Sequence, residues 1–340
     1  MVYLNIYKKE NAMRQIIMTG PGKSKVIDVP IPEINDDEIL VRVTLSGICH
    51  SEYYPWLTAK EGDVLGHESI GVVEKLGKNV AGFKIGDRVS GLGGGAFKEY
   101  IVMEPAKCFH VPDSLKDEDA ITEPLACQLS AAMKLPIKTL GDSIAVVGCG
   151  YMGLGVISLF KAMGYGQIVA VDKRDIALEN AKKFGATEVY KPEELPREYI
   201  LNYDTMGQID LTRDSDNALL FKLGFDTVME FTGTEDGLQL AGDMVKAHGR
   251  LGIGGYHNDG MRSIDYQLWN FKAITTINCH ERRVMYEAGL CKRCLELLDS
   301  GLWKFTGVTR IYEMEDFDQA NKDLDAHKDN YIKGAIRCSK

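Results

Sequence analysis

The feature that most restricts the fold of this chain is a regular alternation of apolar strand-like segments and helical segments after residue 142. Strands are predicted over residues 143–147, 167–172, 188–190, 226–231, 250–253 and 274–277, and helices over residues 151–163, 175–184 and 236–246. Strands that alternate with helices predict a parallel sheet covered by helices on both faces. We therefore predict a doubly wound α/β domain in the central part of the chain.

A glycine-rich turn lies between the first of these strands and its helix. It reads Gly148-Cys149-Gly150-Tyr151-Met152-Gly153, which is the spacing G-x-G-x-x-G. In this motif the first glycine allows a tight turn, the second lets the backbone approach a pyrophosphate, and the third lets the helix pack closely on the strand. Asp172 ends the next strand, about 20 residues further on, where an acidic side chain would bind the ribose hydroxyls of NAD. The candidate cofactor-binding residues are Gly148, Gly150, Tyr151, Met152, Gly153, Asp172, Lys173, Gly233 and Gly254.

The residues that follow Asp172 bear on the choice between NAD and NADP. Lys173 and Arg174 are both basic and could hold the additional phosphate of NADP. The Asp172 carboxylate would repel that phosphate. NAD is therefore the predicted cofactor, and NADP is the alternative.

The two ends of the chain show a different pattern, in which short strands and turns dominate. Val41, Val43 and Leu45 alternate with polar residues, which predicts a half-buried strand that ends at Gly47. Further strands are predicted over residues 70–76 and 97–102, and a loop over 91–95. Such closely spaced strands are typical of a small barrel or sandwich. After residue 280 the pattern predicts helices over 285–298 and 317–326 and strands over 308–312 and 333–338.

Composition excludes several classes of function. The chain has 340 residues, which suits two domains, and its 40 basic and 49 acidic residues give a net charge of −9. This charge argues against a nucleic-acid or anionic-membrane partner. The eight cysteines have no dense spacing, which favours a reduced, cytoplasmic location. Residues 1–12 lack the apolar core of a signal peptide, and we expect them to form a mobile extension.

Two short polar motifs follow or precede predicted strands in the N-terminal part. Cys49 lies in Gly47-Ile48-Cys49-His50-Ser51-Glu52, and His67 lies in Gly66-His67-Glu68. A thiol and an imidazole are ligands that zinc prefers, and a site with three protein ligands keeps one coordination position open. Each residue alone would be explained as a buried core side chain. Together, ahead of a dinucleotide-binding pattern, they predict a catalytic zinc site.

These motifs, with Gly86-Asp87-Arg88-Val89, Glu123-Pro124-Leu125 and the glycine motif, occur in an order that resembles the zinc-dependent medium-chain dehydrogenase/reductase family of the alcohol dehydrogenase superfamily. The chain is most similar to its polyol (sorbitol) and threonine dehydrogenase branch. The resemblance implies an α/β protein with a β-rich, GroES-like catalytic domain over residues 13–124 and 281–340. It implies an NAD-binding Rossmann domain over residues 125–280, after the extension at 1–12.

The resemblance also implies roles for individual residues. Cys49 and His67 match the first two catalytic zinc ligands, and either Glu68 or Glu123 supplies the third. Ser51 matches the residue that relays the proton of the alcohol, whereas Glu52 departs from the commoner aspartate. The segment 89–100 has no cysteine, so one catalytic zinc and no structural zinc are expected.

The expected activity is hydride transfer between NAD and a small secondary alcohol, such as a polyol, a sugar or an amino alcohol, or the corresponding ketone. One alternative is an NADPH-dependent reductase of an aldehyde, ketone or steroid-like carbonyl, and another is a nucleotide-sensing protein without the chemistry. A homodimer or homotetramer is expected, with no nucleic-acid or membrane partner. The aromatic residues Tyr53, Tyr54 and Trp56 are candidates for the substrate wall. Residues 191–225 are charged and weakly periodic, and they are either a peripheral excursion or a loop that touches the substrate or a neighbouring subunit.

Overall fold

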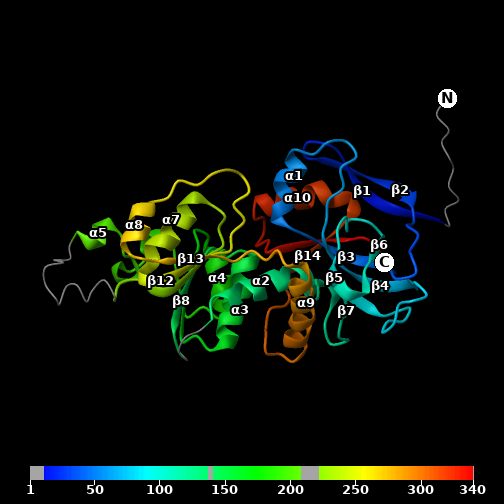
Figure 1. Ribbon diagram of the computed structural model, residues 1–340. Coiled ribbons are helices and arrows are strands. Elements are labelled where there is room, and N and C mark those ends of the chain that lie inside the picture. The colour runs from blue at the N-terminus through cyan, green and yellow to red at the C-terminus, as the bar shows by residue number, and fades with distance from the viewer. Residues whose placement is uncertain (1–10, 137–140, 208–221, 340) are drawn as a thin grey trace. The chain divides into compact units, whose positions relative to one another are not determined.

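The structure is a computed structural model that describes residues 11–136, 141–207 and 222–339 (Figure 1). The chain divides into two compact units. Unit 1 consists of Met1–Ala126, Arg283–Gly301 and Thr306–Lys340, and unit 2 consists of Cys127–Arg282 and Leu302–Phe305. Most of the extension expected at residues 1–12 lies outside the described residues, but Ala12 already belongs to the first strand.

Unit 2 contains a six-stranded sheet in which every pair of neighbours is parallel. The strand order is β10-β9-β8-β11-β12-β13. The strands are β8 (Ser143–Val147), β9 (Gln167–Val171), β10 (Glu188–Tyr190), β11 (Phe225–Glu230), β12 (Val245–Ile253) and β13 (Thr275–Asn278). The chain moves outward in one direction from β8 through β10 and in the other from β11 through β13. In such sheets ligands bind at the carboxyl ends of the strands, at the point where the direction changes.

The helices of this region are α2 (Thr122–Lys134), which begins in unit 1, then α3 (Tyr151–Met163), α4 (Asp175–Phe184), α5 (Tyr203–Met206), α7 (Glu235–Met244) and α8 (Tyr266–Phe271). The predicted bounds of α3 and α4 are correct. The helix predicted to reach Lys246 ends at Met244, because Val245 pairs with Phe225 and starts β12. Helix α8 was not predicted. Of the charged segment 191–225, residues 208–221 lie outside the described residues.

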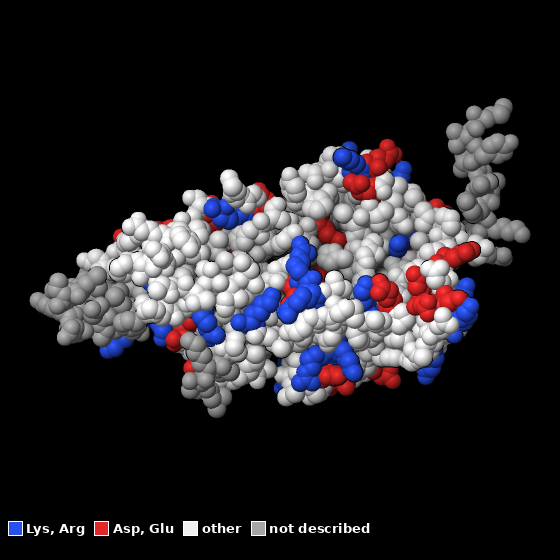
Figure 2. Space-filling view, in the orientation of Figure 1, with Lys and Arg blue, Asp and Glu red and all other residues white. Residues whose placement is uncertain are grey.

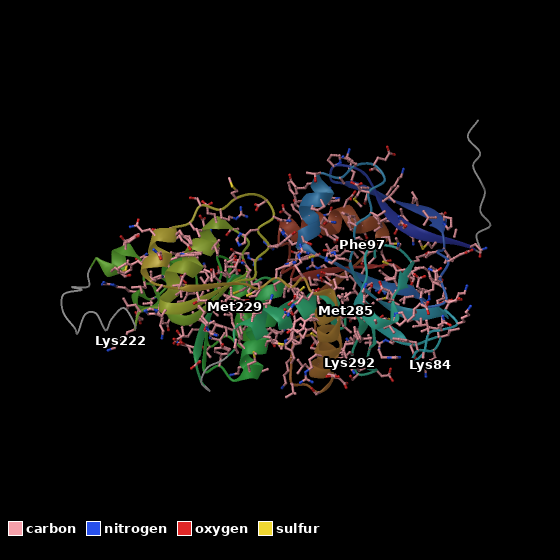
Figure 3. The ribbon with its side chains drawn as sticks, in the orientation of Figure 1. Lys84, Phe97, Lys222, Met229, Met285 and Lys292 are labelled. Carbon is pink, nitrogen blue, oxygen red and sulfur yellow. The ribbon has the colours of Figure 1, made fainter. Side chains whose placement is uncertain are left out.

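The core of unit 2 explains why its strands are nearly continuous apolar runs. Val146, Val169 and Met229 are fully buried, as expected for strands that helices cover on both faces. Met229 lies within the sheet in Figure 3. The doubly wound α/β class that the alternation predicts is confirmed for this unit.

Unit 1 contains a seven-stranded sheet and a separate two-stranded hairpin. The sheet order is β14-β15-β3-β4-β5-β7, with β6 paired to β3. The strands are β1 (Ala12–Gly20), β2 (Lys23–Pro30), β3 (Ile39–Ile48), β4 (Glu68–Leu76), β5 (Arg88–Leu92), β6 (Tyr100–Met103), β7 (Cys108–His110), β14 (Thr309–Glu313) and β15 (Lys333–Arg337). The β-rich class is confirmed. The hairpin β1–β2 was not predicted, and Gly91 and Leu92, which were expected in a loop, extend β5 instead.

The pairing of β3 with β4 and β15 brings distant parts of the chain to one place. Antiparallel pairing sets Gly47 opposite Glu68 on β4 and opposite Ala335 on β15. Residues near position 48 therefore lie beside residues near 68 and beside residues near 333.

Among the described residues, helices α1 (Tyr53–Leu57), α9 (Val284–Asp299) and α10 (Phe317–Asp325) lie wholly in unit 1. On α9, Cys291 and Cys294 are buried and Lys292 is exposed (Figure 3), so the two cysteines are core residues. Figure 2 shows basic and acidic side chains beside one another on the visible face of this unit, in agreement with the absence of a large basic surplus in the sequence. Among the described residues, no helix combines the length and the apolar composition needed to cross a bilayer.

Candidate functional site

Three of the four predicted metal residues converge at one end of the β3–β4 pair. Cys49 directly follows β3, and His67 directly precedes β4, whose first residue is Glu68. Because the two strands are antiparallel, the end of one meets the start of the other. The Cys49 sulfur, one imidazole nitrogen of His67 and one carboxylate oxygen of Glu68 all lie within 4.8 Å of one another.

The fourth predicted metal residue lies next to this cluster. Glu123 is in the first turn of α2, and its Oε2 is 3.9 Å from His67 Nε2. Burial and the nearby charge of Glu68 raise the pKa of the Glu123 carboxyl to about 7, against the opposing effect of His67. Two carboxyl groups in one buried place repel each other, and a bound cation would relieve that repulsion.

Glu52 orients the imidazole of His67. It belongs to a 3-10 turn, His50–Glu52, that follows Cys49. Its Oε1 accepts a hydrogen bond from the backbone N–H of Gly66 at 2.6 Å and lies 2.9 Å from His67 Nδ1. With Nδ1 engaged by a carboxylate, the Nε2 atom is the one available to a metal, which is the usual arrangement around ligating histidines.

The surroundings of His67 favour a positive charge. Burial by itself lowers the pKa of the imidazole, but hydrogen bonds with Cys49 and Glu52 and the charge of Glu68 outweigh burial and raise this pKa to about 12. The carboxylates that favour this proton would also balance the charge of a metal cation.

Lys333 completes the cluster, and the sequence pattern did not identify it. Its ammonium is buried, lies 2.5 Å from Glu68 Oε2 and donates a hydrogen bond to the carbonyl oxygen of Ile48 at 3.0 Å. Burial opposes its charge, but Glu68 raises its pKa above the usual value. A Cβ atom at position 47 would overlap the Glu68 carboxylate, so a larger residue there would displace Glu68.

The donor set fits zinc. It offers a thiol sulfur, an imidazole nitrogen and a carboxylate oxygen, which are the three ligand types of zinc sites. The Glu68 Oε1 atom is buried and has no hydrogen-bond partner among the described residues. A buried carboxylate oxygen without a donor is costly unless a cation balances it.

Ser51 and the aromatic residues that follow it have different surroundings. The Ser51 hydroxyl donates to Cys49 Sγ at 3.1 Å, so it lies beside the first candidate metal ligand. Tyr54 is half exposed. Trp56 is only 2% exposed and its Nε1 donates to Asp318 at 3.0 Å, so Trp56 is a core residue and not the substrate wall that was expected.

The glycine motif of unit 2 has the geometry that its spacing predicts. Gly148 has a φ of +98°, and a Cβ there would lie 2.8 Å from the backbone of Phe231. Gly153 packs against the Gly148 carbonyl so closely that a Cβ would overlap its oxygen. Gly150 is the N-cap of α3 and faces open space. Tyr151 and Met152 are the first two residues of α3, whose N-terminal N–H groups favour an anion.

The other candidate nucleotide residues lie at the carboxyl ends of parallel strands. Asp172 follows β9 and accepts a hydrogen bond from the Cys149 N–H at 2.9 Å, so it contacts the glycine motif directly. Lys173 is exposed, 3.7 Å from Asp236. Gly233 follows β11 with a φ of +68°, and Gly254 follows β12, where a Cβ would collide with the Phe231 ring.

A buried glutamate links the loops after β11 and β12, and the sequence did not identify it. Glu230 Oε1 accepts hydrogen bonds from the N–H groups of Thr232 and Gly233 at 2.5 and 2.7 Å. Its Oε2 lies 3.1 Å from His257 Nε2, and Arg262 donates to His257 Nδ1 at 2.9 Å. An acidic residue at the end of an apolar strand was the only signal that could have pointed to it.

Two family models match the chain. The alcohol dehydrogenase GroES-like domain matches residues 35–113, and the zinc-binding dehydrogenase domain matches residues 152–289. The first match lies in unit 1 and contains Cys49, His67 and Glu68.

Curated relatives and solved structures agree with these matches. The chain is 30% identical to sorbitol dehydrogenase of Bacillus subtilis over 281 residues, which are 72% of this chain and 75% of that protein. It is 27% identical to L-threonine 3-dehydrogenase of Escherichia coli over 85% of this chain and 89% of that protein. The crystal structure of 2R,3R-butanediol dehydrogenase from Bacillus subtilis superposes with a TM-score of 0.74 at 20% identity, over 96% of this chain and 99% of that one. The chain therefore belongs to the zinc-dependent medium-chain dehydrogenase/reductase family, in its polyol and threonine dehydrogenase branch.

Proposed function

We propose that this protein is a zinc-dependent dehydrogenase that oxidises a small secondary alcohol, a polyol, sugar or amino alcohol, with NAD as the hydride acceptor. The observation that carries the proposal is the convergence of Cys49, His67 and Glu68 within 4.8 Å in a member of this family. Its curated relatives are named for sorbitol, D-xylulose and L-threonine, which are small hydroxylated molecules. A reduced, cytoplasmic location and a homodimer or homotetramer remain predictions.

Glu68 is the preferred third ligand, and Glu123 lies beside the cluster. Glu68 forms the compact group with Cys49 and His67, whereas the contact that supports Glu123 is its 3.9 Å approach to His67 Nε2. Lys333 pairs with Glu68 Oε2, which leaves Oε1 for the metal. The Glu123 carboxylate would then balance part of the charge of a bound cation.

Different residues have different roles in the proposed reaction. A bound zinc ion would supply a Lewis acid that lowers the pKa of the alcohol. Glu52 holds His67 in the orientation that presents Nε2. The Ser51 hydroxyl, 3.1 Å from Cys49 Sγ, accepts the proton of the alcohol and passes it outward. Bound NAD would supply the hydride acceptor, so that oxidation of the alcohol would yield a ketone, a proton and NADH.

In unit 2 the backbone of the glycine motif and the first turn of α3 would hold the pyrophosphate. Gly150 allows the approach because its Cα faces open space. The Glu230 carboxylate fixes the loop that contains Gly233, which forms part of the nucleotide site.

The experiment is metal analysis of the purified protein, combined with a panel of polyols, amino alcohols and secondary alcohols tested with NAD. About one zinc per chain is expected, together with turnover of at least one member of the panel. Protein that holds no zinc and oxidises none of these alcohols would contradict the proposal.

The third ligand has its own test. Glu68→Gln should weaken zinc binding by about tenfold or more, and Glu123→Gln should weaken it less, because a direct ligand contributes more than a neighbouring charge. Competition with a chromogenic chelator measures both affinities. A larger loss in Glu123→Gln would assign the third ligand to Glu123.

A further inference from the structure

The carboxylate that is expected to bind the ribose of NAD is already fully engaged. Asp172 Oδ1 accepts hydrogen bonds from the backbone N–H and the Nε of Arg174, both at 3.0 Å. Asp172 Oδ2 accepts from Arg174 Nη2 at 3.1 Å and from the Cys149 N–H at 2.9 Å. A carboxylate has about four lone-pair sites, so these four hydrogen bonds use all of them.

Two consequences follow for the nucleotide. The ribose hydroxyls of NAD can reach Asp172 only if the Arg174 side chain gives up its place. The negative charge that would repel a 2′-phosphate is also balanced, because the guanidinium forms a bidentate pair with the carboxylate. The acidic-residue rule that predicts NAD assumes a free carboxylate, and Asp172 does not meet that condition.

Arg174 can donate further hydrogen bonds to an anion. A guanidinium has five N–H groups in a planar fork, and the pair with Asp172 uses two of them. The Arg174 side chain is 31% exposed, whereas that of Asp172 is 10% exposed. The remaining N–H groups are therefore on the more accessible partner, in the loop between β9 and α4.

The other cations of this region have carboxylate partners nearby. Lys173 Nζ lies 3.7 Å from Asp236, and Lys191 Nζ lies 2.8 Å from Asp175. Lys173 is also highly exposed, so its charge is strongly screened by solvent. Arg174 is the cation whose position is fixed by the residue that faces the ribose.

We propose that Arg174 is a specificity-determining residue that allows this chain to bind NADP as well as NAD. The 2′-phosphate binds at the outer edge of the guanidinium while Asp172 holds the inner edge. With NAD, Arg174 moves aside and Asp172 accepts the ribose hydroxyls. The inference rests on the proposed dinucleotide site, but it does not depend on the alcohol or on zinc.

The test is titration of NADH and NADPH into the full-length protein, followed by nucleotide fluorescence, without any alcohol. In the wild type, NADPH should bind less than about a hundredfold more weakly than NADH, a difference below about 3 kcal/mol. Arg174→Ala should weaken NADPH by about tenfold or more, because it removes a charge-assisted bidentate contact, and should change NADH by less than about threefold. Arg174→Lys should restore only part of the NADPH affinity, because it keeps the charge but loses the fork.

The matched control is Lys182→Ala, which removes one positive charge from an exposed position in the last turn of α4. It should leave the NADPH/NADH ratio of dissociation constants unchanged. Asp172→Asn should shift that ratio toward NADPH, because it removes the carboxylate that accepts the ribose hydroxyls of NAD and so weakens NADH. The thermal melting of each variant verifies that it is folded.

Three results would overturn the inference. They are equal weakening of both nucleotides in Arg174→Ala, a loss of NADPH affinity in Lys173→Ala that Arg174→Ala does not produce, and wild-type NADPH binding beyond the hundredfold limit. Each can occur while the protein still contains zinc and oxidises an alcohol with NAD. Conversely, protein that lacks zinc and turnover would contradict the proposed function and leave the measured ratio interpretable.

Discussion

The candidate nucleotide site of unit 2 and the candidate metal centre of unit 1 are built in different ways. The glycine motif spans residues 148–153, and Asp172 follows after one helix and one strand. The metal centre combines residues 49, 67, 68, 123 and 333, which antiparallel pairing of β3 with β4 and β15 and the start of α2 bring together. A site made from one contiguous motif can be predicted from local sequence, whereas a site assembled from distant strands requires the sheet register.

The two units also use buried lysines differently. Lys333 in unit 1 pairs with the Glu68 carboxylate, and its pKa is raised although burial opposes the charge. Lys272 in unit 2 donates to the carbonyl oxygens of Leu201, Gly242 and Asp243 at 2.9, 2.6 and 3.3 Å. Burial lowers the pKa of Lys272 to about 8. The pKa of Lys333 is raised because its partner is a carboxylate, whereas burial lowers the pKa of Lys272 because its hydrogen-bond partners are neutral carbonyl oxygens.

The largest expected effect is a loss of zinc and turnover without a loss of NADH binding. Cys49→Ser should abolish zinc binding and reduce turnover by roughly 10⁴-fold, because the Lewis acid contributes several kcal/mol. The affinity for NADH, which unit 2 provides, should change by less than about threefold. Metal analysis, kcat and NADH titration measure these effects. A variant that keeps wild-type turnover without zinc would show that the reaction does not need the metal centre.

The next effect concerns the stability of unit 1. Lys333→Met should lower the free energy of unfolding of the metal-free protein by about 3–5 kcal/mol, because it leaves the buried Glu68 carboxylate without its cation. Urea denaturation measures the loss. The double variant Lys333→Met/Glu68→Gln should recover most of it, and Lys292→Met, on the exposed face of α9, should have no effect. Equal losses in the single and double variants would mean that the ion pair is not the cause.

The third effect is the pH dependence of the unfolding free energy, to which Lys272 and Lys333 should contribute in opposite ways. Between pH 8 and 10.5 the unfolded chain holds more protons at Lys272 than the folded chain, so stability rises with pH in this window. Relative to Lys272→Met, the wild type should gain about 3 kcal/mol from pH 7.5 to 10.5. Relative to Lys333→Met, it should show no such gain, because the raised pKa of Lys333 keeps it charged throughout. Unfolding free energies from urea denaturation over this pH range provide the measurement, and parallel pH profiles for the two variants would contradict the assignment.

The smallest effect examines the proton pathway beside the metal ligand. Ser51→Ala should lower kcat by about 10²-fold, because it removes the hydroxyl that takes the alcohol proton, and leave the KM for NAD nearly unchanged. Ser51→Thr should restore part of the turnover because it retains a hydroxyl. A kcat loss that matches the loss of NAD affinity would exclude the relay.

Much of unit 2 could be predicted because its signals are local. Helices α3 and α4 have the predicted bounds, since each combines an apolar stripe with a glycine, Gly164 or Gly185, that ends the helix in the left-handed conformation. Where a strand pairing competed with the helical pattern, at Val245, the pairing determined where α7 ends. The prediction was wrong there because sheet contacts are not local.

The sequence by itself determined the two architectures and the glycine motif, and it predicted Cys49 and His67 as metal ligands, because these depend on periodicity and on short motifs. The tertiary structure alone decided that Lys333 neutralises Glu68, that Glu52 orients His67, that Trp56 is buried against Asp318 and that Arg174 occupies the carboxylate of Asp172. Except for the Asp172–Arg174 pair, these contacts join residues far apart in the chain. They are set by strand register and side-chain direction, which no local pattern encodes.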